Sequence, residues 1–219
     1  MHQEDGNTMI TIGVLDLQGA VKEHVERINE LGGAKALKVK NVGDLEAIYG
    51  LIIPGGESTT IGKLLRDFDM LNPLKKKIES GLPVWGTCAG MIILAKSIIG
   101  KDYNHLGVMD IEVRRNGYGS QLDSFIINEI VEGVSNEEIP LVFIRAPYVE
   151  KVHEDVQVLC KLKDKIVACR QENMLATSFH PELTKDLTMH KYFYNMCMEN
   201  LNLKEALKSD SFYKILRLS

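Results

Sequence analysis

The chain has 219 residues, of which 45% are hydrophobic, which is enough for one α/β domain with a substantial core and short for two. Its formal net charge of -4 argues against nucleic-acid binding, and no apolar run approaches the ~20 residues needed to cross a bilayer. The polar, acidic start also lacks the basic-then-apolar pattern of a secretion signal. We therefore expect a cytoplasmic protein with neither a nucleic-acid nor a membrane partner. Residues 1–8 are interpreted as a disordered leader or a cloning remnant, with Met9 as a natural start.

The first hundred residues alternate between strand-like and helix-like segments. Residues 9–17 are apolar and rich in β-branched side chains, which is typical of a buried strand. Residues 19–33 carry apolar side chains on one helical face and charges on the other, which indicates a helix. Further strands are predicted at 34–40, 50–54 and 82–85, and further helices at 43–50, 60–68, 73–81 and 91–99. This alternation predicts a mostly parallel sheet with helices on both faces, in which ligands collect at the carboxyl ends of the strands.

The second half of the chain is richer in strand-like segments. They are predicted at 108–115, 124–131, 140–149, 156–170 and 175–183, with a hairpin turn around Lys163 and Asp164. A helix follows at 190–202, and residues 203–219 are predicted to form a helical tail. Because we find no internal repeat and no linker, we expect a single domain over residues 9–202. The expected fold class is α/β, a three-layer sandwich around a mostly parallel central sheet.

The pentapeptide Gly-Thr-Cys-Ala-Gly, at 86–90, stands where a strand gives way to a helix. A tight turn of this kind lifts one side chain above the sheet, and small neighbours such as Gly86 and Gly90 relieve the crowding around it. The helix that follows would point free N–H groups at Cys88 and favour its thiolate, with the N–H of Ala89 placed to receive an oxyanion. The alternative interpretation is a buried packing cysteine in a glycine-rich turn.

The remaining cysteines, Cys160, Cys169 and Cys197, are interpreted as small buried hydrophobic residues. No two cysteines have Cys-x-x-Cys spacing, and no cluster of cysteine and histidine suggests zinc. The glycine-rich segment at 54–59 lacks the lysine of a phosphate-binding P-loop, and no dinucleotide-binding motif follows a strand. We therefore expect neither a metal site nor a bound cofactor.

His180 ends an apolar strand-like segment, and Pro181 after it stops the hydrogen-bond ladder. In extended chain, residues i and i+2 point the same way, so the Glu182 carboxylate is predicted to orient the imidazole and stabilise its charged form. A thiol nucleophile needs such a base. The alternative is a strand-end histidine beside a solvated glutamate. The other histidines are interpreted as surface or satisfied polar residues: His2, His24, His105, His153 and His190.

The segment Pro-Gly-Gly-Glu-Ser-Thr, at 54–59, follows another predicted strand. Gly55 and Gly56 can adopt backbone conformations that are closed to other residues, and their N–H groups are candidates for an oxyanion hole. A turn followed by Ser58 as the N-cap of the next helix is the alternative, and the two roles are compatible.

These motifs, in this order, resemble those of the class I (triad) glutamine amidotransferases, which have a flavodoxin-like α/β fold. Within that group the chain is most similar to the glutaminase subunits of pyridoxal 5'-phosphate synthase. The resemblance rests on the segments IGVLDLQG, LIIPGGESTT, WGTCAGMIILAK, RRNGYGSQLDSF, FIRAPY and SFHPEL. It extends from about Met9 to about Asn200 and leaves out the leader and the tail.

The resemblance implies hydrolysis of L-glutamine to L-glutamate and ammonia by a Cys-His-Glu triad. Cys88 would attack the side-chain amide and form a thioester, His180 would carry the protons, and Glu182 would orient His180. Glutamine would be held by Gly55, Gly56, Glu57, Arg115, Ile144 and Arg145, and the oxyanion by Gly56 and Ala89. Arginine forks fit carboxylates, and Arg114 competes with Arg115 for that of the substrate.

The resemblance also implies a partner, a (β/α)₈-barrel synthase subunit of the PdxS type, within a hetero-oligomer. Free ammonia is largely protonated at neutral pH, so a dry passage to the next site preserves the nucleophile. In the family the glutaminase stays weak until this partner binds and the Gly-Gly peptide reorients, and Gln18 lies in the segment similar to the partner-contacting one. Alternatives are the same chemistry serving a synthase of the histidine or purine pathway, a free-standing cysteine hydrolase, and a non-catalytic binding subunit.

Overall fold

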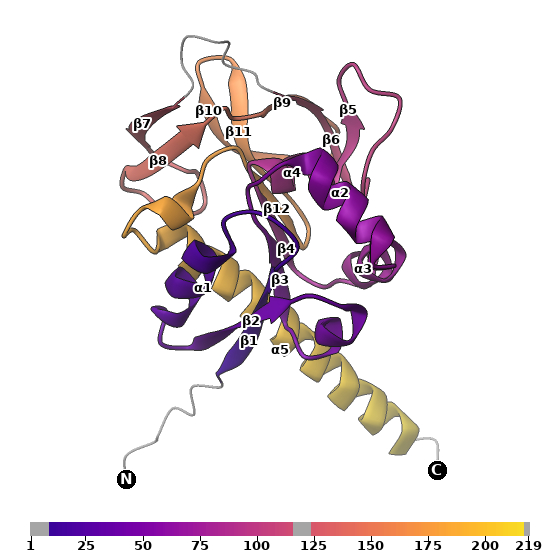
Figure 1. The fold of residues 1–219 in the computed structure, drawn as a ribbon. Helices are drawn as coiled ribbons and strands as arrows, with labels where there is room; N and C mark the ends of the chain where they lie inside the picture. The colour runs from indigo at the N-terminus through magenta and orange to yellow at the C-terminus, as the bar shows by residue number, and fades with distance from the viewer. Residues whose placement is uncertain (1–8, 116–123, 217–219) are drawn as a thin grey trace.

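The fold was analysed in a computed structural model, which describes residues 9–115 and 124–216, with side chains up to residue 207. Helices cover both faces of a central ten-stranded sheet, and a separate two-stranded sheet lies beside it (Figure 1). No helix in the described part of the chain is long and apolar enough to cross a membrane. Part of the segment RRNGYGSQLDSF, at 116–123, lies outside the described residues.

The first half of the chain contains the elements that alternate in the predicted way. They are β1 (Ile10–Leu15), α1 (Val21–Asn29), β2 (Ala34–Val39), the 3₁₀-helix η1 (Val42–Glu46), β3 (Gly50–Ile53), α2 (Ser58–Asp67), α3 (Leu71–Glu79), β4 (Val84–Thr87) and α4 (Ala89–Leu94). The second half begins with β5 (Ala95–Ile98), β6 (Met109–Arg114), β7 (Ser124–Glu129), β8 (Ile139–Ile144) and β9 (Tyr148–Val152). It continues with β10 (Gln157–Leu162), β11 (Lys165–Gln171), β12 (Met174–Thr177), the 3₁₀-helix η2 (Pro181–Leu183) and α5 (Thr188–Leu216).

The order of the strands confirms the predicted fold class. Neighbouring strands in the run β2-β1-β3-β4-β12 are all parallel, which is the flavodoxin-like arrangement. The sheet continues through β11, β9, β6 and β5, where the pairs that involve β11 or β9 are antiparallel. Strand β10 pairs with β11 across a turn at Lys163 and Asp164, the predicted hairpin. This antiparallel extension explains why the second half of the sequence is rich in strands.

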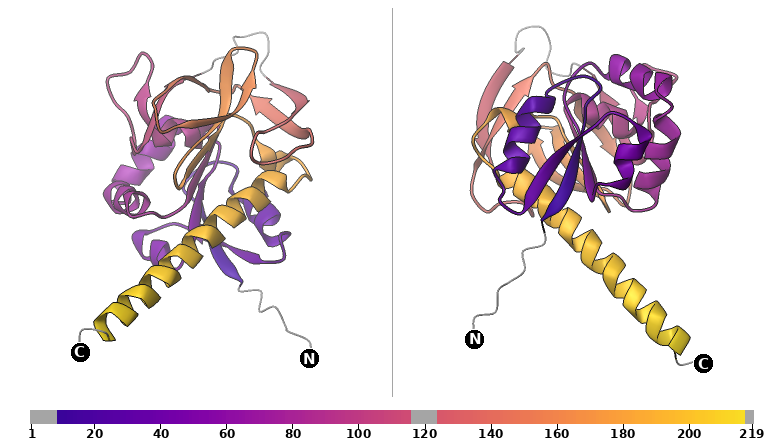
Figure 2. Two further views of the ribbon diagram at one scale, coloured as in Figure 1. Left: turned by 180° about the vertical axis from the view of Figure 1, so that it is seen from behind. Right: turned by 60° about the horizontal axis from the view of Figure 1, so that its bottom comes forward.

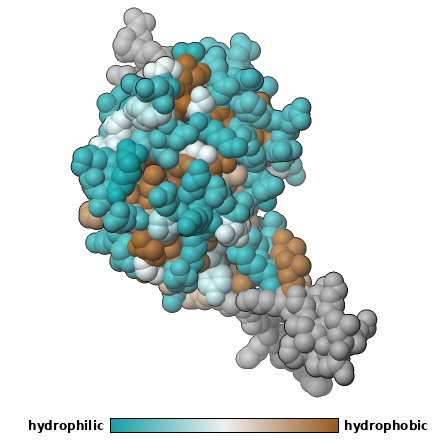
Figure 3. Space-filling view, turned by 90° about the vertical axis from the view of Figure 1, so that its right-hand side faces the viewer, coloured by the Kyte–Doolittle hydropathy of each residue, from teal (hydrophilic) through white to brown (hydrophobic). Residues whose placement is uncertain are grey.

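Two apolar cores lie on the two faces of the sheet. Ile53 packs in the core beneath α2, α3 and α4, whereas its neighbour Ile52 packs in the core beneath α1 and α5. Consecutive residues of a strand point to opposite faces, so a strand covered on both faces is apolar throughout, as β3 is. Figure 2 shows α5 crossing the sheet and continuing beyond it. On this projecting part, Leu203 and Leu207 are exposed, and Figure 3 shows apolar atoms there on an otherwise mostly hydrophilic face.

Several sequence-based boundaries are wrong. The helix predicted at 91–99 ends at Leu94, and Ala95–Ile98 form strand β5, which pairs in parallel with β6. Pairing with a distant strand overrides local periodicity, which cannot register it. The single segment predicted at 140–149 is two strands, β8 and β9, because the backbone turns at Arg145 with a φ of 42°. The helix at 190–202 and the helical tail are one helix, α5.

The turn between β4 and α4 leaves no room for side chains at its two glycines. A Cβ on Gly86 would lie 2.4 Å from the carbonyl carbon and oxygen of Gly90, and a Cβ on Gly90 would lie 2.1 Å from the carbonyl oxygen of Ile53. These obstacles are backbone atoms, which cannot turn away as a flexible side chain can. The glycines therefore allow the end of β4, the start of α4 and the end of β3 to meet.

We predict that Gly90→Ala destabilises the fold, because β3 and α4 must separate to admit the methyl group. Overpacking typically lowers the free energy of unfolding by about 1–3 kcal/mol. We expect a loss at the upper end of this range or above it, because the obstacle is rigid backbone. Gly43→Ala is the control, because its Cβ would meet only the side-chain oxygen of Asn41, at 3.1 Å. Thermal unfolding of both variants beside the wild type measures the difference. Equal melting temperatures for the two variants would contradict the packing argument.

Candidate active site

Cys88 lies at the turn between β4 and α4, at the carboxyl end of the parallel strands. Its backbone has a φ of 49° and a ψ of -103°, and it precedes the first residue of α4, Ala89. A non-glycine residue in such a conformation costs about 1–3 kcal/mol and persists only where the surrounding structure enforces it. Part of that enforcement is a 2.7 Å hydrogen bond from the Cys88 N–H to the carbonyl oxygen of Thr177 in β12.

His180 follows β12 and faces Glu182. The His180 N–H donates to the carbonyl oxygen of Val142 at 2.8 Å, which anchors the residue to β8. Its Nδ1 lies 2.7 Å from Oε1 of Glu182, and because a carboxylate can only accept, Nδ1 carries the hydrogen. The expectation of extended chain here is wrong, since Glu182 belongs to the 3₁₀-helix η2. The turn that Pro181 starts brings the two side chains together instead.

The imidazole of His180 also interacts with Cys88. Burial lowers the pKa of His180, but its hydrogen bonds with Cys88 and Glu182, and its electrostatic interaction with both groups, outweigh burial and raise that pKa to about 10. The ring is therefore held as an imidazolium at neutral pH. With Nδ1 engaged by Glu182, Nε2 remains to exchange a proton with the thiol. This is the arrangement of an activated nucleophile, its base and an orienting group.

A pocket of about 500 Å³ opens above these groups. It is lined by Gln18, Gly19, Ala20, Gly55, Gly56, Glu57, Cys88, Arg115, Ile144, Arg145, His180 and Leu183. Two of the predicted catalytic residues and all six of the predicted substrate-binding residues are among them. Glu182 lies behind His180, and Ala89 lies behind Cys88 as the first residue of α4. The carbonyl oxygen of Ile144 is 4.0 Å from the Cys88 sulfur.

Gly55 is the closest neighbour of the Cys88–His180 pair from β3. A Cβ on Gly55 would lie 2.3 Å from Cε1 of His180 and 3.4 Å from the Cβ of Cys88. Its carbonyl oxygen accepts the N–H of Ala20 at 3.0 Å. The next glycine, Gly56, is covered by Gln18, whose Oε1 also accepts the Glu57 N–H at 2.7 Å.

Two oppositely charged side chains, Glu57 and Arg115, line the wall of the pocket. The Arg115 guanidinium donates to Oε1 of Glu57 at 3.0 Å. Hydrogen bonds from Thr59, followed by the charge of Arg115, lower the pKa of Glu57. Arg114, the competing arginine, pairs with Glu150 outside the pocket. The helix N-cap is Glu57, whose carboxylate accepts the Thr59 N–H at 3.1 Å, so the alternative that Ser58 caps α2 is wrong.

Three histidines that were interpreted as surface or satisfied residues are buried. His24 and His190, which are 0% and 1% exposed, lie behind Glu182, and His105 lies beneath α2. The signal for His24 was present in the sequence, because it shares the buried face of α1 with Val21 and Ile28 at helical spacing. His190 carries the same signal, because it shares the buried face of α5 with Phe193 and Cys197 at helical spacing, whereas His105 lies in a loop and carries none.

The other cysteines differ chemically from Cys88. Burial raises the pKa of Cys160 to about 11 and that of Cys169 to about 12, and it raises the pKa of Cys197 further still. None of these three thiols lines the pocket that contains Cys88. Within residues 9–115 and 124–216, no group of three or more histidine, cysteine, aspartate or glutamate side chains is arranged to hold a metal ion.

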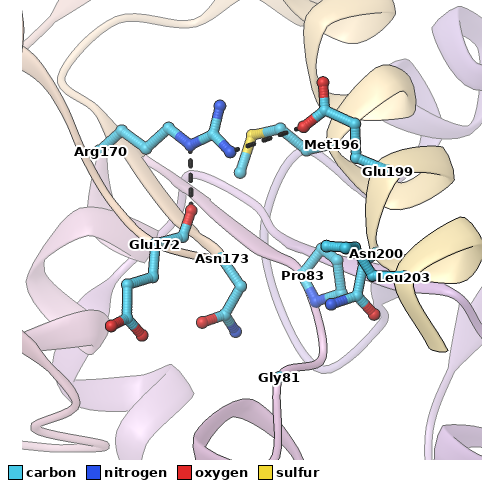
Figure 4. Close-up of a pocket in the computed structure, with 9 residues that line it drawn as sticks. All are labelled: Gly81, Pro83, Arg170, Glu172, Asn173, Met196, Glu199, Asn200 and Leu203. Atoms are coloured by element: carbon cyan, nitrogen blue, oxygen red, sulfur yellow. Dashed lines mark hydrogen bonds and ion pairs between the residues drawn. The ribbon is translucent and has the colours of Figure 1, made fainter. Parts of the chain in front are cut away.

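A second pocket, shown in Figure 4, lies at the opposite end of β4 from Cys88. Pro83 and Asn173 form its wall together with Glu199 of α5, and Arg170 reaches across it. The Arg170 Nε donates to the carbonyl oxygen of Glu172 at 3.0 Å, and its Nη2 lies 3.8 Å from the Glu199 carboxylate. This pocket has no thiol or imidazole in its lining. Cys88 and His180 both lie at the other end of β4, where parallel strands place their ligands.

Comparison with known proteins agrees with this geometry. Residues 14–199 match the model of the SNO glutamine amidotransferase family. The chain belongs to that family. It is 56% identical to the pyridoxal 5'-phosphate synthase subunit PdxT of Ruminiclostridium cellulolyticum, over 86% of this chain and all of that protein. It is 53% identical to the subunit of the same name from Clostridium botulinum, over 88% of this chain and all of that one.

A solved structure supports the family assignment. The crystal structure of a glutamine amidotransferase, 45% identical in sequence, superposes with a TM-score of 0.80 over 85% of this chain and 98% of its own. The resemblance to this family that the motifs carry is thus confirmed. The aligned lengths of the relatives also leave part of this chain unmatched, which fits a resemblance that leaves out the two ends.

We predict that Gly55→Ala lowers the kcat of this protein for glutamine hydrolysis by at least about tenfold. The added methyl group would displace the His180 imidazole from Cys88 and Glu182. The measurement is kcat for the purified variant, with thermal unfolding recorded in parallel. Gly43→Ala, far from the pocket lining, serves as the matched control. If Gly55→Ala kept kcat within twofold of the wild type, the close approach of Gly55 to His180 would have no functional meaning.

Proposed function

We propose that this protein hydrolyses L-glutamine to L-glutamate and ammonia, with Cys88 as the nucleophile, and supplies the ammonia to pyridoxal 5'-phosphate synthesis. One observation supports this most. A strained turn holds Cys88 against an imidazole that Glu182 orients, and this group opens into the pocket with Glu57 and Arg115. The family membership of the chain points to the same activity.

In the first half-reaction, the Cys88 sulfur attacks the side-chain amide carbon of glutamine. A sulfur–carbon bond forms while the carbonyl electron pair moves to oxygen, and the N–H groups of Gly56 and Ala89 are the proposed donors to that oxyanion. The His180 imidazolium then protonates the amide nitrogen. The carbon–nitrogen bond breaks, ammonia leaves, and a thioester remains on Cys88.

In the second half-reaction, water replaces ammonia. His180, now neutral at Nε2, takes a proton from the water as the oxygen attacks the thioester carbon. The carbon–sulfur bond breaks and the electron pair returns to the sulfur as a thiolate, which restores the ion pair with His180. L-Glutamate is released, and Glu182 remains ionised throughout because it orients the ring without exchanging a proton.

The wall of the pocket offers complementary charges for the amino acid end of glutamine. Arg115 presents a guanidinium to the α-carboxylate, and Glu57 presents a carboxylate to the α-ammonium group. Arg115 and Glu57 already pair with each other. Glutamine would replace this one ion pair with two, between Arg115 and the α-carboxylate and between Glu57 and the α-ammonium group. Ile144 and Arg145, at the end of β8, are proposed to contact the substrate from the opposite side.

We also propose a partner, a (β/α)₈-barrel synthase subunit of the PdxS type, within a hetero-oligomer. The relatives from R. cellulolyticum and C. botulinum carry the name of a pyridoxal 5'-phosphate synthase subunit. The Gly55 carbonyl is bound to the Ala20 N–H, so a partner that reorients the Gly55–Gly56 peptide would first break that bond. Gln18 and Ala20 belong to the same loop, which makes this loop the natural place for the partner to act.

We predict that Cys88→Ala lowers glutamine hydrolysis by about 10³-fold or more, as expected for loss of a nucleophile. A glutamine-mimicking electrophile should label Cys88 and spare Cys160, Cys169 and Cys197, whose thiols lie outside the pocket lining and carry raised pKa values. Mass spectrometry of the labelled chain identifies the modified residue. Hydrolysis at the wild-type rate by Cys88→Ala, or labelling elsewhere first, would overturn the assignment.

The choice of acceptor is tested by glutamine labelled with ¹⁵N in its side-chain amide. With the PdxS-type synthase present, we predict that the label enters the ring of pyridoxal 5'-phosphate, and that Cys88→Ala blocks this while added ammonium salts restore it. Label that reached only free ammonia would favour a free-standing hydrolase. If the ¹⁵N label instead entered the product of a histidine- or purine-pathway synthase, that synthase would be favoured as the acceptor.

A further inference from the structure

Two buried imidazoles lie behind the catalytic groups, on helices from separate parts of the chain. His24 of α1 and His190 of α5 contact each other through Nδ1 of His24 and Nε2 of His190, 3.1 Å apart. Nε2 of His24 lies 3.4 Å from Oε2 of Glu182 and 3.3 Å from the hydroxyl of Thr87. Thr87 immediately precedes Cys88, so this cluster contacts both the orienting carboxylate and the nucleophile's own strand.

The contacts are compatible with the following placement of the hydrogens. Burial lowers the pKa of both His24 and His190, which disfavours the charged form of each ring. Because an ionised carboxylate can only accept, Nε2 of His24 carries its hydrogen and Nδ1 holds a lone pair. That lone pair accepts the Nε2–H of His190. The remaining nitrogen, Nδ1 of His190, is then an acceptor, and it has no partner among the described residues.

The second oxygen of Glu182 depends on this arrangement. Glu182 is 4% exposed, and its Oε1 is taken by His180. No hydrogen bond reaches Oε2 from the part of the chain that the structure describes, and the group that faces it is Nε2 of His24, at 3.4 Å. A buried carboxylate oxygen with no donor is costly, and the carboxyl group responds by binding a proton.

We propose that His24 and His190 are positioning residues, which hold the Glu182 carboxylate ionised and aimed at His180. This inference rests on the proposed function, because it assumes that Cys88 and His180 act as nucleophile and base. A continuous chain of polar contacts then leads from α5 to the nucleophile. The titratable and charged groups that face it, from every element packed against it, are His190, His24, Glu182, His180 and Cys88, with Glu23 and Arg27 of α1 at its edge.

The neighbours of Glu182 determine in which direction its pKa changes when His24 is replaced. Burial raises the pKa of Glu182, and the facing imidazoles of His24 and His180 reverse this, so that its pKa lies below the usual value. Without the Nε2–H of His24, the carboxyl group binds a proton at higher pH and no longer supports the His180 imidazolium. The thiolate of Cys88 would then lose its counter-ion.

The test compares two amides at position 24 in the full-length protein. A glutamine side chain reaches the place of the imidazole Nε2 and can donate to Glu182, whereas an asparagine side chain reaches only the place of Nδ1. We measure the rate of Cys88 alkylation by iodoacetamide against pH, by mass spectrometry, because this rate follows the thiolate fraction. His24→Gln should keep the half-maximal pH of the wild type, and His24→Asn should raise it by about one pH unit.

A second pair covers the case in which a variant at position 24 does not fold. His190→Gln keeps a donor to Nδ1 of His24, and His190→Leu does not, so the half-maximal pH should rise for His190→Leu alone. If the two variants at position 24 had the same pH profile of alkylation, and the two at position 190 did too, the positioning role would be overturned. The proposed function would still stand. A wild-type Cys88 that alkylates no faster than a denatured thiol at neutral pH would instead overturn the proposed function itself.

Discussion

The site depends on a backbone contact that tolerates no side chain, the approach of Gly90 to the carbonyl oxygen of Ile53. This contact brings the first turn of α4 over the end of β3, and it forces the chain at Cys88 into a left-handed conformation. The strain is supported by apolar packing on both sides, since β4 and α4 are buried along their whole length. The Cys88 thiol thus lines a pocket while its backbone belongs to the core.

The two halves of the sheet contribute different parts of the site. The parallel half supplies the chemistry, because β3, β4 and β12 end beside one another and carry Gly55, Cys88 and His180 at those ends. The other strands supply the wall, with Arg115 after β6 of the antiparallel half and Ile144 at the end of β8 in the separate two-stranded sheet. A site built on strand ends keeps its reacting groups in fixed register, whereas the wall can vary with the substrate.

Much of this could be predicted from the sequence, and the failures share a cause. Strand–helix alternation and glycine spacing are local, and they predicted the fold class and the turn at Cys88. Strand β5 looks helical until its pairing with β6 is known, and Arg114 and Arg115 are indistinguishable until the sheet decides which one faces the pocket. The role of His190 was overlooked for the same reason, because it arises from contact with His24, 166 residues away.

The buried histidine pair is difficult to explain by packing alone. Burying an imidazole costs free energy unless both ring nitrogens find partners, and Nδ1 of His190 has none among the residues described. Leucine side chains of similar volume would fill the space between α1, α5 and Trp85 without that cost, and replacing buried polar groups in this way is often neutral or stabilising. What leucine cannot do is place a polar N–H group opposite Oε2 of Glu182, where Nε2 of His24 lies at 3.4 Å. The cost is consistent with a cluster whose purpose is to keep a charge in the interior, where the base of the reaction needs it.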